Sequence, residues 1–374
     1  MYFGKNRIMD KLLVVGQTPP PYGGQAIMIK YMLDNFQHQN SIKHIRMCFS
    51  KEFNDRGKFS FYKITHLIQI IFQIWLFRFK YKCNTLYYPI SSSPKVAVFR
   101  DAIILASSRF LFKKIIYHFH AAGISEELPK YNPVIRNIVY MIIKKPDLAI
   151  TSSEYNPKDA EYLKAKNKMI IPLGIPDENI EEKRKIFNEN KPLNLLFVGL
   201  LNSTKGEGYL LDAINILKLK GIKVQLRIAG KFESETYKDL FFSQIKKYGL
   251  ENEIEYKGIV TGKEKEKLFL ESDVLCFPSF FASESFGMVL LEAMMFQMPI
   301  IATRWRGIQS IVDDNKNGYL VDIKDSNNLA ISIEKLHNDR SLLKEMAKCS
   351  RLNFKKKYEL SAYINNMRKA IFNL

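Results

Sequence analysis

The sequence SESFGMVLLEAMMFQ, residues 283–297, indicates more about this chain than any other stretch. It places two carboxylates, Glu284 and Glu292, eight positions apart, with Gly287 and an apolar segment between them. We expect a helix from Phe286 onward, with Glu284 on the loop before it and Glu292 about two turns inside. A helix N-terminus attracts anions, and glycine leaves the backbone there open. An acceptor, an anion site and a second acceptor in this order fit the sugar, diphosphate and ribose of a nucleotide sugar.

Two interpretations of each carboxylate stay open. Glu284 is either a ligand contact or a surface charge that suits the positive end of the helix dipole. Glu292 has apolar neighbours on nearly every face of the expected helix, so we expect it to be buried. Because a buried carboxylate needs a partner, Glu292 binds either a ligand or another side chain of the protein.

The segment ESFGMVLLEA resembles the E-x7-E signature of the family 4 retaining glycosyltransferases, which use nucleotide sugars and have the GT-B fold. The resemblance implies an α/β protein of two Rossmann-like doubly wound domains with a cleft between them, and bacterial polysaccharide biosynthesis as its setting. Further segments resemble this family in the expected order: PPPYGGQA (19–26), LLFVGLLNSTKG (195–206), RIAG (227–230), YKGIV (256–260), SDVLCFPS (272–279) and NGYLV (317–321).

Strand and helix patterns alternate along the whole chain, which predicts parallel sheets flanked by helices. We expect an N-terminal acceptor-side domain over residues 1–172, a Pro/Gly-containing linker over 173–190, and a C-terminal nucleotide-sugar-binding domain over 191–354. The resemblance adds that a C-terminal helix, at about 355–374, packs back on the first domain. Ligand sites of such domains lie at the carboxyl ends of the strands.

The resemblance also assigns roles to single residues. Glu284 would accept hydrogen bonds from sugar hydroxyls, Glu292 from the ribose, and Lys205 would stabilise the leaving diphosphate. His120, at the end of a strand, would lie near the transferred sugar. The further donor contacts would be Gly24, Gln25, Ile259, Val260, Phe286, Gly287, Met288 and Val289.

The residue types alone leave alternatives for several of these positions. Lys205 is also compatible with a solvated surface lysine, and His120 with an ordinary hydrogen-bonded histidine. The loop Pro19–Gly24 is either a close-approach loop for a ligand or a plain turn. Glu126 and Glu127 contact an acceptor or lie on the surface.

The chain departs from the family pattern at three places. Leu200 stands where many members have an arginine, PLGIP (172–176) places Leu173 where an asparagine is common, and Ser310 stands where a glutamate is common. No DxD-type motif lies in a suitable place. We therefore expect no obligatory metal or other cofactor, with the nucleoside diphosphate sugar as the donor substrate.

The positive charge is concentrated in the first half of the chain. Residues 1–172 hold 26 Lys+Arg against 11 Asp+Glu, a net charge of +15, and residues 173–374 hold 31 against 27, a net charge of +4. The excess indicates an anionic partner, such as lipid headgroups, a lipid-phosphate-linked acceptor or nucleic acid, or else a compositional bias. Within this half, Phe59–Lys82 is either an interfacial amphipathic helix or an ordinary core helix.

Four scattered cysteines and the lack of a signal-peptide pattern favour a cytoplasmic protein. We expect it to be peripheral on the inner face of the plasma membrane, with a nucleotide-sugar donor, a lipid-linked saccharide acceptor and no nucleic acid as partners. The rival interpretations are a non-enzymatic nucleic-acid or anionic-lipid binding protein, and a nucleotide-sugar epimerase or glycogen phosphorylase-like enzyme of the same fold.

Overall fold

The computed structural model describes residues 11–36, 41–49, 61–179, 181, 187 and 191–372. The chain forms two compact units. The first extends to Leu173 and includes the C-terminal residues from Ser361, and the second runs from Gly174 to Leu360. Phe59 and Ser60, and residues 180, 182–186 and 188–190 of the expected linker, lie outside the described residues.

The described part of the first unit contains a parallel sheet with the strand order β2-β1-β3-β4-β5-β6. Central strands such as β1 are buried at every residue, because helices cover both faces of a parallel sheet. The strands are β1 (Leu12–Gly16), β2 (Ile42–Arg46), β3 (Thr85–Tyr88), β4 (Lys114–Phe119), β5 (Leu148–Thr151) and β6 (Asn167–Ile170).

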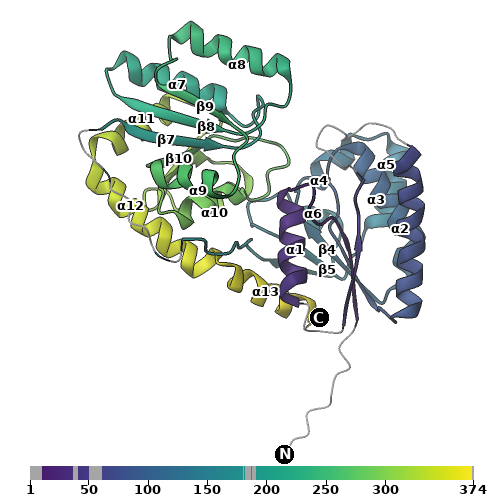
Figure 1. Cartoon of the computed structure of the whole chain (residues 1–374). Helices are drawn as coiled ribbons and strands as arrows, with labels where there is room; N and C mark the ends of the chain where they lie inside the picture. The colour runs from purple at the N-terminus through teal and green to yellow at the C-terminus, as the bar shows by residue number, and fades with distance from the viewer. Residues whose placement is uncertain are drawn as a thin grey trace, which may run out of the picture. The chain divides into compact units, whose positions relative to one another are not determined.

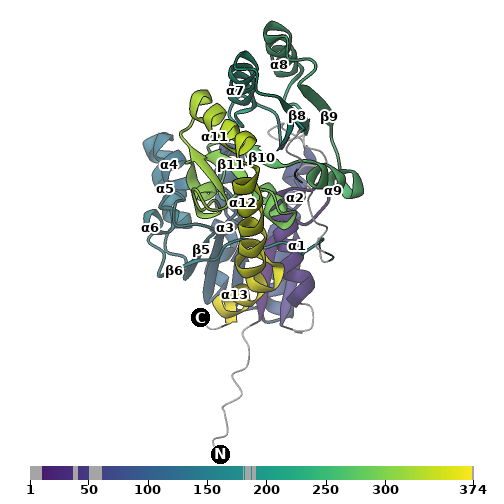
Figure 2. The ribbon, with the colours of Figure 1, turned by 90° about the vertical axis from the view of Figure 1, so that its left-hand side faces the viewer.

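Helices cover the sheet of the first unit in two layers, with α1 and α13 on one face and α2, α3 and α5 on the other (Figure 1). Arg368 of α13 donates a hydrogen bond to the Asn35 carbonyl of α1 at 2.6 Å, and these two helices lie side by side (Figure 2). The helices are α1 (Gly24–Phe36), α2 (Phe61–Lys80), α3 (Lys95–Ser108), α4 (Ile124–Glu127), α5 (Pro133–Ile143), α6 (Asp159–Tyr162) and α13 (Leu360–Phe372), with 3-10 turns η2 (Arg109–Leu111) and η3 (Leu128–Lys130).

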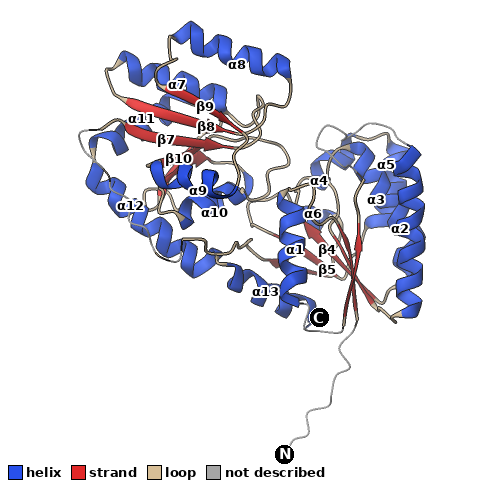
Figure 3. Ribbon diagram, in the orientation of Figure 1, coloured by secondary structure: helices blue, strands red, loops and turns tan. Residues whose placement is uncertain are grey.

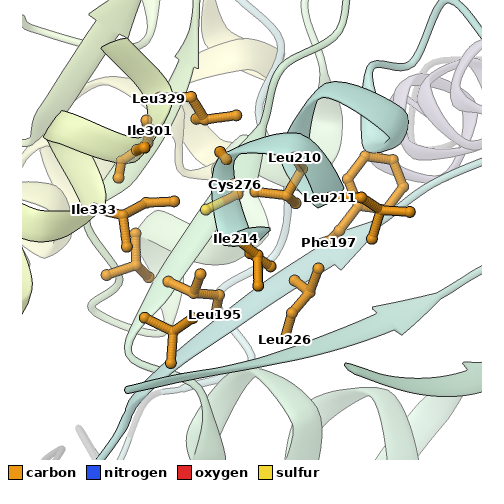
Figure 4. Close-up of a cluster of buried hydrophobic side chains, with 14 of the residues drawn as sticks. Leu195, Phe197, Leu210, Leu211, Ile214, Leu226, Cys276, Ile301, Leu329 and Ile333 are labelled. Carbon is orange, nitrogen blue, oxygen red and sulfur yellow. The ribbon is translucent and has the colours of Figure 1, made fainter. Parts of the chain in front are cut away.

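The second unit repeats this design with the strand order β12-β11-β10-β7-β8-β9, again parallel (Figure 3). Its core contains leucines and isoleucines from β7, α7 and α11 around Cys276 of β10 (Figure 4). The strands are β7 (Leu193–Val198), β8 (Val224–Ala229), β9 (Ile254–Gly258), β10 (Val274–Phe277), β11 (Ile300–Thr303) and β12 (Gly318–Val321).

The helices of the second unit cover its sheet in a Rossmann-like arrangement. The predicted α/β class with two doubly wound sheets is confirmed. They are α7 (Glu207–Leu219), α8 (Glu235–Tyr248), α9 (Gly262–Glu271), α10 (Met288–Met295), α11 (Ser326–Asn338) and α12 (Arg340–Asn353), with the 3-10 turn η4 (Arg306–Ser310) and the π-turn η5 (Phe354–Tyr358).

The strand order also marks where each unit offers space for a ligand. In the second unit the chain runs from β7 outward to β8 and β9, and then returns to place β10 on the other side of β7. The connections that leave β7 and β10 therefore diverge to opposite faces, and ligands of open α/β sheets bind at such a switch point. In the first unit the same reversal lies between β1 and β3.

One predicted helix boundary is wrong. The helix of the E-x7-E segment begins at Met288 rather than Phe286, because Gly287 adopts a left-handed conformation with φ +92°. Glu292 is consequently the fifth helical residue, about one turn inside α10 rather than two.

Candidate active site

The loop between β10 and α10 presents the first carboxylate of the motif. Glu284 precedes the N-cap Gly287 by three residues, and the side chain of Phe286 between them is buried against the ring of Tyr358. Only the backbone of Phe286 can therefore face a ligand. Met288 and Val289 occupy the first turn of α10, whose N–H groups have no acceptor within the helix.

Glu284 forms an ion pair with Lys205. The Lys205 Nζ lies 2.5 Å from Glu284 Oε2, and the exposed fractions of the two side chains are 14% and 12%. The ammonium also lies 4.8 Å from the centre of the Phe281 ring, a distance at which a cation is attracted by the aromatic face. The pair thus places one cation and one carboxylate, both mostly shielded from water, next to the N-terminus of α10.

The loop from β7 to α7 has a shape that directs Lys205 to this position. The Asn202 side chain accepts hydrogen bonds from the backbone N–H groups of Thr204 and Lys205, both at 3.1 Å. The backbone N–H of Phe280 donates to the Thr204 carbonyl at 2.8 Å. This bond joins the loop after β7 to the loop after β10 at the switch point of the sheet.

Glu292 has a structural partner, Lys265 of α9, whose Nζ lies 2.6 Å from Glu292 Oε1. The expected burial of Glu292 is only partial, since a quarter of its side chain is exposed. Burial nevertheless raises the pKa of Glu292, and the nearby Glu178 charge raises it further. The Lys265 charge lowers this pKa, but the net shift is upward. The carboxylate is therefore held at the rim of the site, where one oxygen meets Lys265 and water can reach the side chain.

The loop after β9 lies at the same edge of the sheet, because the carboxyl ends of parallel strands share one edge. Gly258 has a left-handed φ of +68° and turns the chain, so that Ile259 is exposed and Val260 is buried. A ligand at this edge can meet the backbone of the turn and the exposed Ile259 side chain.

In the first unit, the Pro/Gly loop follows β1 at the switch point of that sheet. Arg46 donates hydrogen bonds to the carbonyls of Thr18 and Pro20 and so fixes the start of the loop. Gly24 is exposed at the first position of α1, and Gln25 is half-buried beside it. The loop therefore offers open backbone at a helix N-terminus.

His118 and His120 share one buried hydroxyl. The Tyr87 hydroxyl lies 2.6 Å from His118 Nδ1 and 3.3 Å from His120 Nε2, and the two imidazole rings are 3.9 Å apart. Burial lowers the pKa of His120 to about 3, and burial together with the neighbouring His120 lowers that of His118 well below its usual range. Both imidazoles are consequently neutral at pH 7, and His120 can serve as a neutral hydrogen-bonding group.

The remaining sequence candidates have ordinary surroundings. Glu127 pairs with Lys130 at 2.7 Å on the surface, and Leu173 is buried. Ser310 donates to the Gly307 carbonyl, and its own carbonyl accepts a hydrogen bond from Tyr358. Ser310 thus helps to hold the turn beside Phe286 in place.

Sequence reasoning missed Lys265 and the buried Glu207, which is the first residue of α7 and follows the Lys205 loop. Lys265 precedes Glu292 by 27 residues in another helix, and no spacing pattern connects the two. Only the folded structure reveals this contact. Within the described residues, no group of three or more His, Cys, Asp or Glu side chains is placed to hold a metal ion.

Comparison with known proteins finds a family similarity in the second unit. Residues 178–353 match the family model "Glycosyl transferases group 1". Over these residues, just under half of the chain, this protein is similar to the group 1 glycosyl transferases. The match covers Lys205, Ile259, Glu284 and Glu292, whereas Gly24 and His120 lie outside it.

Among the curated proteins similar to this chain are one from a cps region and one named for colanic acid biosynthesis. An uncharacterized 41.2 kDa protein in the cps region of Klebsiella pneumoniae is 31% identical over 57% of this chain and 59% of its own. The putative colanic acid biosynthesis glycosyltransferase WcaL of Salmonella typhimurium is 25% identical over 60% of this chain and 61% of its own. Across the compared curated relatives, the matches span between 38% and 61% of the relatives' own lengths.

Solved structures extend the likeness in fold to nearly the whole chain. HepE of Anabaena, crystallised in complex with UDP, has a TM-score of 0.71 and 16% identity, covering 97% of this chain and 100% of its own. The lipopolysaccharide outer core galactosyltransferase WaaB has a TM-score of 0.71 at 15% identity, covering 97% and 99%. These likenesses confirm the GT-B fold class for this chain.

Proposed function

We propose that this protein is a retaining glycosyltransferase that moves a hexose-type sugar from a nucleoside diphosphate sugar to an acceptor hydroxyl. The observation that carries the proposal is the Lys205–Glu284 ion pair beside the N-terminus of α10. Within the segment that matches the family, the pair provides a cation for the diphosphate and a carboxylate for the sugar hydroxyls. The N-terminus of α10 beside it provides N–H groups that can also bind the diphosphate.

In this proposal, these groups act by electrostatic stabilisation and hydrogen bonding. As the glycosidic bond breaks, negative charge grows on the diphosphate, and Lys205 and the first N–H groups of α10 stabilise it. Glu284 accepts hydrogen bonds from donor sugar hydroxyls, and Glu292 accepts them from the ribose in exchange for part of its contact with Lys265. His120, as a neutral imidazole, bonds the transferred sugar.

The acceptor in this proposal is a lipid-linked saccharide at the inner face of a bacterial plasma membrane. The net charge of +15 in residues 1–172 supports an anionic acceptor or surface. One relative is named for a cps region and another for colanic acid biosynthesis, which supports polysaccharide synthesis as the setting. Among the described helices, none has the length and hydropathy needed to cross a membrane.

A thermal-shift screen against UDP, GDP, ADP and CMP sugars tests donor binding, because a ligand that binds the folded state raises the melting temperature. One of these donors should raise it, and the matching transfer reaction should keep the anomeric configuration of the donor sugar and persist in EDTA. If no nucleotide sugar binds and none is hydrolysed, the proposal fails. Binding of nucleic acid without any sugar transfer would favour the rival binding protein.

A further inference from the structure

Helix α2 has two apolar stripes, one buried and one exposed. Ile70 and Ile74 pack into the core of the first unit, as expected of a core helix. A second stripe with helical spacing faces outward, where Phe72 is 67% exposed. The exposed residues of this stripe are Phe61, Ile64, Ile68, Phe72, Trp75, Leu76 and Phe79.

The neighbouring helices of the same layer continue the exposed apolar surface. Phe110, in the turn η2 that follows α3, is 65% exposed, and its ring meets Trp75 edge-on at 5.9 Å. The Trp75 Nε1 donates to the Ser107 carbonyl of α3 at 2.9 Å, which fastens the two elements together. Helices α3 and α5 add the exposed residues Val96, Ile103, Val134, Ile135, Ile138 and Met141.

These stripes face the same way because the three helices form one layer. Helices α2, α3 and α5 cover the same face of the sheet, with α2 against α3 and α3 against α5 (Figure 1). Each buries its inner stripe on the sheet, so the opposite stripes point outward together. We call this surface of α2, α3, η2 and α5 the outer helical face. So many exposed apolar side chains on one layer of helices are unusual for a protein that stays free in water.

The charge of the outer helical face indicates what covers it. The elements α2, α3, η2 and α5 lie wholly within the described residues, and the only acidic residue they contain is Asp101, which is buried and paired with Arg100. Besides Arg100, cations on and beside the same elements include Lys63, Arg78, Lys80, Lys82, Lys95, Arg109, Lys113, Arg136, Lys144 and Lys145. A second copy of this face would bring cations against cations, whereas an anionic lipid surface complements both the charge and the apolar side chains.

We infer that the outer helical face docks the protein flat on an anionic lipid bilayer, with the exposed apolar stripes of α2, α3 and α5 at the headgroup boundary. This inference says which surface of the protein binds the membrane that the proposed function includes as a partner. Only the biological reason for this binding rests on the proposed function. Docking itself needs neither donor nor acceptor. It can therefore succeed or fail independently of sugar transfer.

The two tryptophans of the chain provide a reporter, since Trp75 lies on the outer helical face and Trp305 lies in the second unit. The full-length protein is mixed with vesicles of phosphatidylglycerol and phosphatidylcholine, with bromine atoms in the acyl chains that quench nearby tryptophan. We expect quenching at low salt that weakens at high salt. The variant Trp75→Phe should lose it, and Trp305→Phe should keep it.

Cosedimentation of variants with the same vesicles tests the face directly. Phe72→Asn with Phe110→Asn should lower partitioning roughly tenfold or more, because both exposed side chains leave the interface. The matched control is Leu219→Asn with Leu240→Asn, which changes exposed apolar residues of α7 and α8. The double variant Lys80→Glu with Lys82→Glu should also lower partitioning onto the vesicles roughly tenfold or more. The matched control, Lys344→Glu with Lys348→Glu on α12, should not lower it.

Several results would overturn the inference. One is that the protein does not bind the vesicles at low salt. Another is that Trp75→Phe and Trp305→Phe are quenched equally. A third is that the control variants lose as much vesicle partitioning as the face variants. Self-association that Phe72→Asn abolishes, without vesicle binding, would assign the face to a second copy of the chain. Donor thermal shifts should be unchanged in the face variants, and vesicle binding should be unchanged in Glu292→Gln. A failure of docking is thereby separated from a failure of the proposed function.

Discussion

At the scale of single residues, the two carboxylates of the motif each have a lysine partner in the second unit. Lys205 and Glu284 form a mostly buried pair, and Lys265 and Glu292 form a partly exposed one. A partly exposed ion pair stabilises a protein by only about 0–1 kcal/mol. The Lys265–Glu292 pair can therefore open for a ligand at little cost to the fold.

Changing Lys205 to Ala should reduce turnover more than donor affinity. The charge that Lys205 meets on the diphosphate is larger in the transition state than in the ground state. Single-turnover rates and donor affinity, measured together, separate the two effects. The matched control is Lys220→Ala, which breaks the exposed Lys220–Glu334 pair of the same unit. Equal losses in rate and affinity would make Lys205 a plain binding residue.

Changing Glu292 to Gln should weaken nucleotide binding and leave the fold intact. A charge-assisted hydrogen bond of about 1.5–3 kcal/mol is lost, which is roughly tenfold to a hundredfold in affinity. Calorimetry with the nucleotide found in the thermal-shift screen measures this loss, with Glu334→Gln as the control. An unchanged affinity would contradict the ribose role. An unfolded variant would favour a purely structural pairing with Lys265.

The buried Glu207 makes stability depend on pH. Burial raises the pKa of its carboxyl from 4.5 to about 7, against the effects of the backbone N–H at the start of α7 and of the Tyr237 hydroxyl. Between these values the folded state binds more protons at Glu207 than the unfolded state. The contribution of this group to stability is therefore fully present below about pH 4.5 and is lost as the pH rises through about 7. The full loss from this group is about 3 kcal/mol.

Changing Glu207 to Gln should remove this loss. Urea unfolding at pH 5 and at pH 8 measures it as the difference between variant and parent, which cancels the other titrating groups. The control is Glu235→Gln, the first residue of α8, whose side chain is 83% exposed. If both variants keep the pH dependence of the parent, Glu207 ionises normally in the folded protein.

At the scale of elements, the site depends on how α7 begins. Gly206 caps the helix with a φ of +84°, and a Cβ added there would lie 2.1 Å from the backbone oxygen of Pro278. Gly221, beyond the other end of α7, has a similar φ of +75° but open space around it. The two glycines thus share the left-handed strain and differ in the steric contact.

Changing Gly221 to Ala should cost about 1 kcal/mol, the ordinary cost of a side chain in the left-handed region. Changing Gly206 to Ala should cost more, because the backbone of the loop after β10 must move. It should also lower donor affinity by displacing Lys205. Urea unfolding and donor titration of both variants measure these effects. Equal costs would show that the close approach to Pro278 carries no energy.

At the scale of the whole molecule, the end of the chain belongs to the unit where the chain begins. Helix α13 buries Tyr363 and Met367, and the Phe372 ring lies 5.8 Å from Phe36 of α1. The first unit therefore needs the C-terminal residues to cover its sheet. The folded first unit thus combines residues from both ends of the described sequence.

Changing Met367 to Ala should destabilise the first unit by about 2–5 kcal/mol, because a fully buried side chain is truncated. Hydrogen exchange of peptides from residues 11–173 should show the loss of protection, whereas peptides of the second unit should change little. Lys369→Ala, on the exposed side of the same helix, is the control. A loss confined to the second unit would contradict the assignment of α13.

The sequence by itself determined the two doubly wound α/β halves and most strand positions, because short buried apolar runs alternate with helical patterns. It also singled out Glu284, Glu292 and Lys205 as candidate site residues, since these residues stand in motifs of contiguous sequence. The family match over residues 178–353 agrees with that part of the interpretation. The basic first half was likewise visible from composition.

Only the tertiary structure decided which side chains meet. Lys205 and Glu284 are 79 positions apart, and they pair because the loops after β7 and β10 meet at the switch point of the sheet. Lys265 reaches Glu292 from another helix, and the left-handed Gly287 moved the start of α10. The stripes of α2 could be separated into core and surface only when the sheet showed which one it covers. Contacts distant in sequence are set by strand order and backbone conformation, and local patterns do not encode them.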